Sequence, residues 1–93
     1  MDRLEAMATF LAVVETGSLS AAARQLKTPL ATVSRKVSEL ESHLRTKLFN
    51  RSSRKLVLTD AGSSYFAACK RILADVTEAE RAASANIPLR PES

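Results

Sequence analysis

The sequence contains few cysteines, glycines, prolines and aromatic residues. Among its 93 residues are one Cys, two Gly, three Pro, three Phe, one Tyr and no Trp. A single cysteine excludes an internal disulfide framework and is typical of a protein from a reducing cytoplasm. The scarcity of glycine, proline and aromatic residues favours helix over sheet.

Long hydrophobic runs and targeting segments are also lacking. No secretory h-region follows Met1, and no apolar stretch is long enough to cross a membrane, so we expect no membrane partner. Apolar residues make up 45% of the chain and charged residues 26%, which predicts a globular protein. The length predicts one domain with a modest core, too small for an enzyme with a deep pocket.

Negative charge is scarce in the central part of the chain. Residues 24–55 contain nine basic residues and two acidic ones, Glu39 and Glu41, so this segment carries nine minus two, or +7, against +4 for the whole chain. A basic centre between net acidic flanks indicates a surface that faces a polyanion. A solvated helix face is the alternative interpretation of the charge run taken alone.

The central motif spans residues 19–44 and predicts two helices joined by a tight turn. The first helix is rich in alanine, which allows close approach of the second, and Lys27-Thr28-Pro29 interrupts the pattern. We expect Thr28 to cap the second helix, Pro29 to occupy its first position, and Lys27 to adopt a positive φ at a cost on the order of 1 kcal/mol. The second helix has a polar and basic face opposite an apolar stripe of Leu30, Val33, Val37, Leu40 and Leu44. This layout is typical of a helix-turn-helix.

Two further helices flank the motif. Residues 2–16 predict an amphipathic helix that ends at Gly17, and Ser18 is a candidate cap for the helix that follows. Residues 61–84 predict a long last helix, capped by Thr59 or Asp60, whose apolar residues recur at heptad-like spacing. We expect its first turns to close the core and its later turns to pack on a second copy of the chain. The predicted dimer interface consists of Tyr65, Ala68, Ile72, Val76, Ala79 and Ala83.

The segment before the last helix predicts a two-stranded ribbon at about residues 48–58. Leu56 and Leu58 share one face, Lys55 and Val57 point to the other, and the tip is polar and basic. A hairpin this small must pack on the helices to be stable. The predicted fold is therefore mainly α: a winged helix-turn-helix with a three-helix core, a two-stranded β-wing and a long C-terminal linker and dimerisation helix.

Three sequence motifs lie along the chain in a specific order and spacing. They are F-L-A-V-V-E-T-G-S-L-S-A-A-A-R-Q-L, then V-S-R-K-V-S-E-L-E, then L-F-N-R-S-S-R-K-L-V-L-T-D-A-G. Together they resemble the N-terminal DNA-binding domain of LysR-type transcriptional regulators, over residues 1 to about 86. The resemblance implies a DNA-binding domain at 1–59 (helix-turn-helix at about 19–38, wing at about 48–58), a linker helix at 60–84, and a hinge or frayed tail at 85–93.

The resemblance also implies sequence-specific binding of double-stranded DNA by a homodimer of a cytoplasmic, nucleoid-associated regulator of bacterial type. A small-molecule effector would bind only through a C-terminal domain that is absent from this sequence. By position, the resemblance assigns base reading to Leu30, Ala31, Ser34 and Arg35, and we expect the hydroxyl of Thr32 to donate to a base or a phosphate. The family commonly has glutamine, which hydrogen-bonds to base edges, where this chain has Leu30. The leucine side chain suits an apolar contact to a thymine methyl group instead. Arg54 matches the wing arginine that enters the minor groove in the family. From residue type and position we expect phosphate contacts from Thr28, Pro29, Lys36, Arg51, Ser52 and Ser53.

Several alternatives remain open from the sequence. Arg35 projects from the polar face and can reach a guanine edge or a phosphate, but a surface ion pair with Glu39 is the other interpretation. A winged helix can also serve protein–protein contact without binding DNA, in which case we would expect an acidic or apolar recognition face. RNA binding is a third possibility and would call for exposed aromatic residues.

The sequence contains no pattern typical of a catalytic or metal site. It lacks a nucleophile with a base and an acid, a Gly-rich phosphate loop, and paired carboxylates, so we predict a protein that is not an enzyme and has no cofactor. His43 has no ligand partners at suitable spacing and is predicted to lie on the surface. Cys69 is predicted to be a packed or half-exposed thiol.

Overall fold

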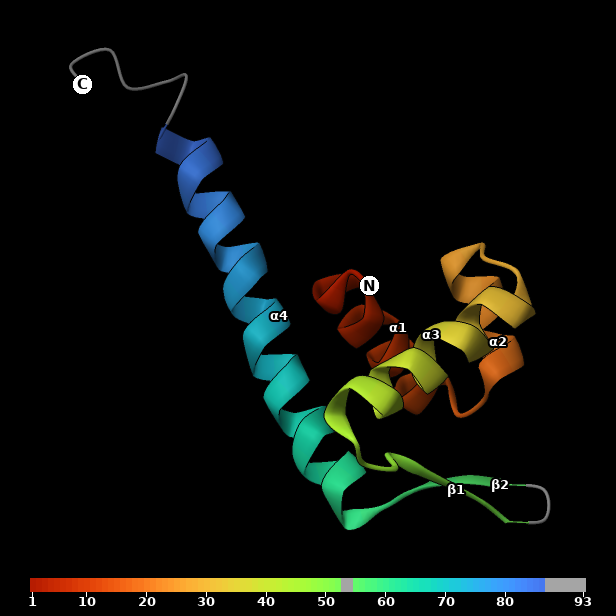
Figure 1. Ribbon diagram of the computed structural model, residues 1–93. Coiled ribbons are helices and arrows are strands. Elements are labelled where there is room, and N and C mark those ends of the chain that lie inside the picture. The colour runs from red at the N-terminus through yellow and green to blue at the C-terminus, as the bar shows by residue number, and fades with distance from the viewer. Residues whose placement is uncertain (53–54, 87–93) are drawn as a thin grey trace.

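The computed structural model describes residues 1–52 and 55–86 and is a mainly α, winged helix-turn-helix structure, as the sequence predicts (Figure 1). Three helices come first: α1 (Arg3–Thr16), α2 (Leu19–Leu26) and α3 (Leu30–Leu44). The hairpin strands β1 (Phe49–Ser52) and β2 (Lys55–Leu58) follow. The last helix, α4 (Asp60–Asn86), extends away from the body of the molecule (Figure 1).

The ends of α1 and α2 are fixed by local hydrogen bonds. The Asp2 carboxylate accepts from the Glu5 N–H at 3.1 Å and caps α1. Gly17 ends the helix with φ 90°, a conformation that glycine adopts without steric cost. The Ser18 hydroxyl accepts from the Ala21 N–H at 3.0 Å and caps α2. The predicted roles of Gly17 and Ser18 are therefore confirmed.

The turn between α2 and α3 differs in part from the prediction. Lys27 has φ 53°, the expected left-handed conformation. The prediction that Thr28 caps α3 is wrong, because its hydroxyl donates instead to the Leu26 carbonyl at 3.1 Å. Pro29 is itself the capping residue, one position before the helix, with extended ψ of 144° and no side-chain cap. Its carbonyl accepts from the N–H groups of Thr32 and Val33, at 3.0 and 3.1 Å.

The hydrophobic core is centred on Phe10, whose side chain has no exposed surface. Its ring centroid lies 5.4 Å from that of Phe49 and 5.4 Å from that of Tyr65, so one α1 side chain contacts both β1 and α4. On α3, Val33, Val37 and Leu40 are buried and Leu44 is half-buried against the core. Leu30 does not join this stripe as predicted: it lies in the first turn of α3, beyond the core, and is 48% exposed.

The wing is an antiparallel hairpin that is packed on one side. Phe49 pairs with Leu58, and Arg51 pairs with Leu56. Leu56 and Leu58 pack against the core whereas Val57 is 49% exposed, which confirms the predicted alternation. The tip residues Ser53 and Arg54 lie outside the described residues.

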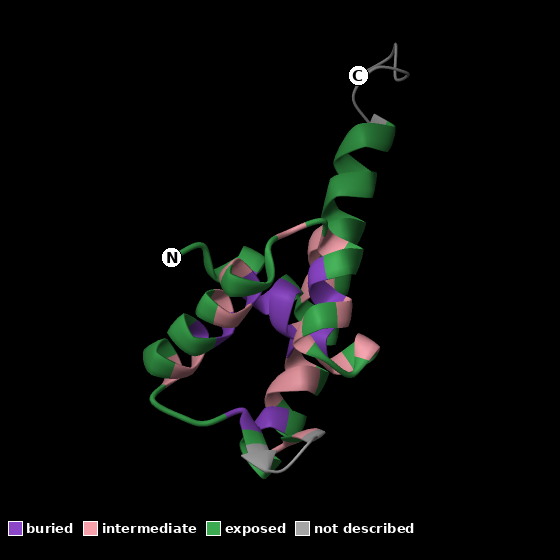
Figure 2. Ribbon diagram, turned by 90° about the vertical axis from the view of Figure 1, so that its right-hand side faces the viewer, coloured by how far each residue is buried: buried purple, intermediate pink, exposed green. Residues whose placement is uncertain are grey.

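The long helix α4 packs on the core only through its first turns. The Thr59 hydroxyl accepts from the Gly62 N–H at 2.9 Å and caps the helix. Cys69 is fully buried, and Tyr65, Phe66 and Leu73 are partly buried against the hydrophobic core. Tyr65 was predicted to belong to the dimer interface, but its ring packs against the core of its own chain. Figure 2 shows that the distal turns of α4 are exposed.

Gly17 and Gly62 are required for different reasons. Gly17 adopts a positive φ, which the sequence indicated, whereas Gly62 allows a close approach between elements. A Cβ added at Gly62 would meet the Leu48 carbonyl oxygen and, at 2.9 Å, the Leu58 Cδ2 atom. The residue therefore allows the start of α4 to approach the segment that leads into β1. No sequence pattern indicated this close approach, because it depends on packing between elements.

Because Lys27 is in the left-handed conformation, we expect glycine to stabilise the protein at this position and to destabilise it at a nearby helical position. Lys27→Gly removes the Cβ strain and should raise the free energy of unfolding by about 1 kcal/mol. Gln25→Gly, at an exposed helical position two residues earlier, should instead lower it by ~0.5–1 kcal/mol. Urea denaturation measures both, and a Lys27→Gly variant less stable than the parent would contradict the expectation.

Candidate nucleic-acid interface

The outward face of α3 is polar and lies opposite the apolar stripe. Val33 and Val37 are buried, so Arg35, two residues from each, projects away from the core with a side chain 62% exposed. The same face carries further exposed residues one and two turns along: Ala31, Ser38, Glu39 and Ser42. The predicted orientation of Arg35 is therefore confirmed, and its contact to DNA stays a prediction.

Arg35 also makes the ion pair that the sequence offered as an alternative. Its Nη1 lies 3.8 Å from Glu39 Oε2, and both side chains are largely exposed, at 62% and 45%. Exposed pairs of this kind contribute only ~0.3–0.5 kcal/mol. The guanidinium is thus held weakly and can exchange Glu39 for a stronger acceptor.

The first turn of α3 presents the other predicted base-reading residues. Leu30 and Ala31 are exposed, and Thr32 and Ser34 are half-buried. No side chain caps this helix start, so the N–H groups of Leu30 and Ala31 in the first turn have no side-chain acceptor. Such a helix N-terminus favours anions such as phosphate. This geometry suits the contacts predicted for Thr28 and Pro29.

Lys36 does not join the outward face. Its Nζ lies 3.0 Å from Glu5 Oε1 on α1, and its side chain is 22% exposed. The reason is helical geometry, because one residue after Arg35 the helix has turned by 100° toward α1. The structure therefore brings Lys36 to an interhelical ion pair and not to the surface that carries Arg35.

The predicted wing contacts can be placed only by their backbone. Arg51 and Ser52 lie in β1, in register with Leu56 and Lys55 of β2. Ser53 and Arg54 fall outside the described residues. Their contacts to phosphates or to the minor groove stay predictions.

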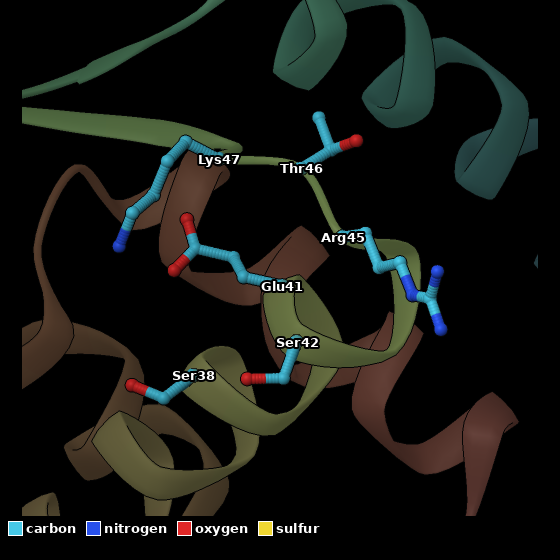
Figure 3. Close-up of a pocket in the computed structure, with 6 residues that line it drawn as sticks. All are labelled: Ser38, Glu41, Ser42, Arg45, Thr46 and Lys47. Atoms are coloured by element: carbon cyan, nitrogen blue, oxygen red, sulfur yellow. The ribbon is translucent and has the colours of Figure 1, made fainter.

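Sequence reasoning missed a polar hollow between α3 and the segment that leads to β1. A hollow of about 380 Å³ is lined by Ser38, Glu41, Ser42, Arg45, Thr46 and Lys47 (Figure 3). Arg45 and Lys47 are exposed, and Ser38 and Ser42 share the outward face with Arg35. The spacing 35, 38 and 42 already places these three positions on one helix face. These residues extend the basic and hydroxyl-bearing surface toward β1.

Other chemistry is limited in the described part of the chain. His43 is exposed, as predicted, and no group of three or more His, Cys, Asp or Glu side chains there is arranged to hold a metal ion. Cys69 is packed, and burial raises the pKa of its thiol, which keeps it protonated and unreactive. Burial, together with this neighbouring thiol, raises the pKa of Tyr65 to about 12. None of the helices within residues 1–52 and 55–86 is apolar over a length that would cross a membrane.

The predicted dimer residues of α4 are accessible to different degrees. Ile72 is 38% exposed, Ala79 and Ala83 are exposed, and Ala68 and Val76 are half-buried. Tyr65 lies against Phe10. The stripe from Ala68 to Ala83 is therefore largely uncovered in a single chain.

The chain is similar to curated transcriptional regulators. It is 47% identical over 78 residues to the HTH-type transcriptional activator AaeR of Escherichia coli, which covers 84% of this chain and 25% of that protein. It is 50% identical over 80 residues to an HTH-type transcriptional repressor of Pseudomonas aeruginosa, with 86% and 25% covered. The chain thus spans about a quarter of the length of these relatives, which are named as regulators and not as enzymes.

Solved structures agree with this similarity. The BenM DNA-binding domain in complex with catB site 1 DNA superposes with a TM-score of 0.88 at 28% identity, covering 92% of this chain and 94% of that one. CrgA of Neisseria meningitidis, a LysR-type transcriptional regulator, gives 0.74 at 43% identity, covering 87% and 28%. Residues 4–63 match the family described as bacterial regulatory helix-turn-helix protein, lysR family. The chain therefore belongs to the LysR family of bacterial helix-turn-helix regulators.

Proposed function

We propose that this chain binds double-stranded DNA in a sequence-specific manner, with α3 in the major groove and the wing in the adjacent minor groove. The observation that carries the proposal is the outward face of α3, where Arg35 lies opposite the buried stripe and is 62% exposed. A helix fits the major groove, and a guanidinium can bind guanine O6 and N7 in bidentate fashion. The match in fold to the BenM domain bound to DNA supports this docking.

The contacts divide into those that read sequence and those that position the protein. Arg35, with Ala31 and Leu30 in the exposed first turn, is suited to base edges and thymine methyl groups. The start of α3, which has no side-chain cap, and the cations Arg45 and Lys47 are suited to phosphates. The Lys36–Glu5 pair argues against a phosphate role for Lys36.

We further propose that two chains associate through α4 when they act on DNA. The helix runs to Asn86, well past its last core contact at Leu73, and carries the uncovered stripe described above. Helical DNA-binding modules commonly bind as dimers at paired half-sites. The resemblance to the family also implies that a small-molecule effector would act through a further domain.

Variants at two arginines test the docking. A bidentate contact from Arg35 is worth roughly 1–3 kcal/mol of discrimination, so Arg35→Ala should weaken specific binding and flatten the preference at one base pair of each half-site. Arg54→Ala should weaken binding mainly on sites with A·T-rich flanks, where a narrow minor groove attracts arginine. Both are measured against a randomised operator library.

A control variant is measured against the same library. Glu15→Ala alters an exposed residue of α1 outside the proposed interface and should leave the preferences unchanged. Equal loss of affinity by both arginine variants on every sequence would mean that both residues contact phosphates only.

Charges introduced on the outer stripe of α4 test the dimer. Ile72→Asp with Val76→Asp would bury two unpaired charges in the proposed interface, so sedimentation should show a monomer whose helix content is retained. Ala74→Asp with Thr77→Asp adds the same charges on another exposed face of the helix and should leave the dimer intact. A parent chain that is monomeric at high micromolar concentration would overturn this part of the proposal.

A further inference from the structure

We propose that Glu41 is a positioning residue for DNA binding: its carboxylate fixes the wing relative to the recognition helix α3. The inference rests on the proposed function, since it assigns a residue through which the wing is held in its DNA-binding orientation. Glu41 lies on α3 and lines the hollow between this helix and the segment that leads to β1 (Figure 3). It is one of two acidic residues in the basic central segment, where a negative charge opposes binding of a polyanion.

The carboxylate of Glu41 binds the backbone at the base of the wing. One oxygen, Oε2, accepts from the Leu48 N–H at 2.8 Å and from the Phe49 N–H at 3.2 Å. Leu48 and Phe49 are themselves buried, at 1% and 6% exposure, so the N–H groups lie where an unpaired donor is costly. Hydrogen bonds to a carboxylate are stronger than those to a neutral acceptor.

The backbone of Glu41 also organises the end of α3. Its carbonyl accepts from the Thr46 N–H at 3.1 Å, and Arg45 turns the chain with φ 55°. The residue therefore holds both the last turn of the recognition helix and the first residues of the wing. A shift of either element would break hydrogen bonds at this one side chain.

The other contacts at the wing base lead to different elements. The Leu48 carbonyl accepts from the Thr59 N–H at 3.0 Å, and the Thr59 hydroxyl donates to the Lys47 carbonyl at 2.7 Å. These bonds tie the segment to the start of α4. Among the residues that the structure describes, the two bonds of Glu41 are those that join a side chain of α3 to the wing.

The carboxylate of Glu41 should affect DNA binding in two opposite ways. Its negative charge repels phosphates, whereas its hydrogen bonds hold the wing in place, so variants that separate the two effects test the role. Removing the negative charge alone should favour binding, because it reduces repulsion of the phosphates. Glu41→Gln does this while its carbonyl oxygen can still accept from both N–H groups. Glu41→Ala and Glu41→Leu remove the acceptor as well, and leucine keeps the side-chain bulk and helix propensity.

Affinity for a duplex operator is measured for the parent and these variants, below the unfolding temperature of each. Glu41→Gln should bind as tightly as the parent or more tightly. Glu41→Ala and Glu41→Leu should bind about fivefold or more weakly, as expected when buried donors are left unpaired. Glu15→Ala removes an exposed carboxylate of α1 that lies outside the proposed interface, and should leave binding unchanged.

A double-mutant cycle shows whether the effect acts through the wing. Ser53→Asn with Arg54→Gly replaces the two residues between the paired Ser52 and Lys55 by a favoured hairpin turn without the tip arginine. In that background Glu41→Leu should lower the affinity for the operator less than about twofold, because the effects of coupled residues are not additive. Amide hydrogen exchange at Leu48 and Phe49 should accelerate in the leucine variant and stay near the parent rate in the glutamine variant.

The possible outcomes are distinct. If the leucine and alanine variants bind as tightly as Glu41→Gln, Glu41 acts only by its charge and the inference is wrong. An undiminished loss in the tip-substituted background would also overturn it, since the effect would then bypass the wing. A parent chain that binds no duplex would refute the proposed function instead, a result separate from any difference among the Glu41 variants.

Discussion

The packing of Phe10 against Phe49 and Tyr65 is the interaction on which the rest of the structure depends. One buried ring on α1 contacts the first strand of the wing and the start of α4, at 5.4 Å between centroids in both cases. A buried phenylalanine contributes several kcal/mol, because its loss leaves a cavity. The wing would otherwise be an isolated two-stranded hairpin, which is marginal in water. This cluster therefore gives the wing and the long helix fixed positions relative to the three-helix core.

The orientation of α3 gives that core a functional consequence. Because Val33, Val37 and Leu40 pack inward, the same helix must present Arg35 and Ser38 to solvent. The segments on either side of α3 each contain one residue in the left-handed conformation, Lys27 before the helix and Arg45 after it. This conformation is strained for a residue with a Cβ atom, but it allows a tight turn at each end of α3. A rigid helix that projects a polar face with an exposed arginine beside a hairpin is the geometry that a major groove and an adjacent minor groove require.

The sequence was most informative where structure is local. Periodicity predicted the helices and the hairpin. Residue type and position predicted Ser18 as one cap and gave Thr59 as one of two candidates for another. It was less informative where tertiary packing decides, as with the first turn of α3, where Leu30 extends beyond the core. Lys36 turned toward Glu5, and Tyr65 toward Phe10, because of neighbours that periodicity cannot identify. Glu41 was counted only as a charge, since its bonds to Leu48 and Phe49 appear once the chain is folded.

The salt dependence of duplex binding tests most directly the central claim, which is recognition of DNA by the outward face of α3 and the wing. Affinity for an operator duplex and for single-stranded RNA of the same length is measured over a series of salt concentrations. Each neutralised phosphate should contribute about −0.9 to the slope of log affinity against log salt, so several contacts per chain give a steep line for the duplex. We expect this steep slope together with weaker binding of the RNA. A flat slope for the duplex, or equal affinity for the RNA at every salt concentration, would contradict the account.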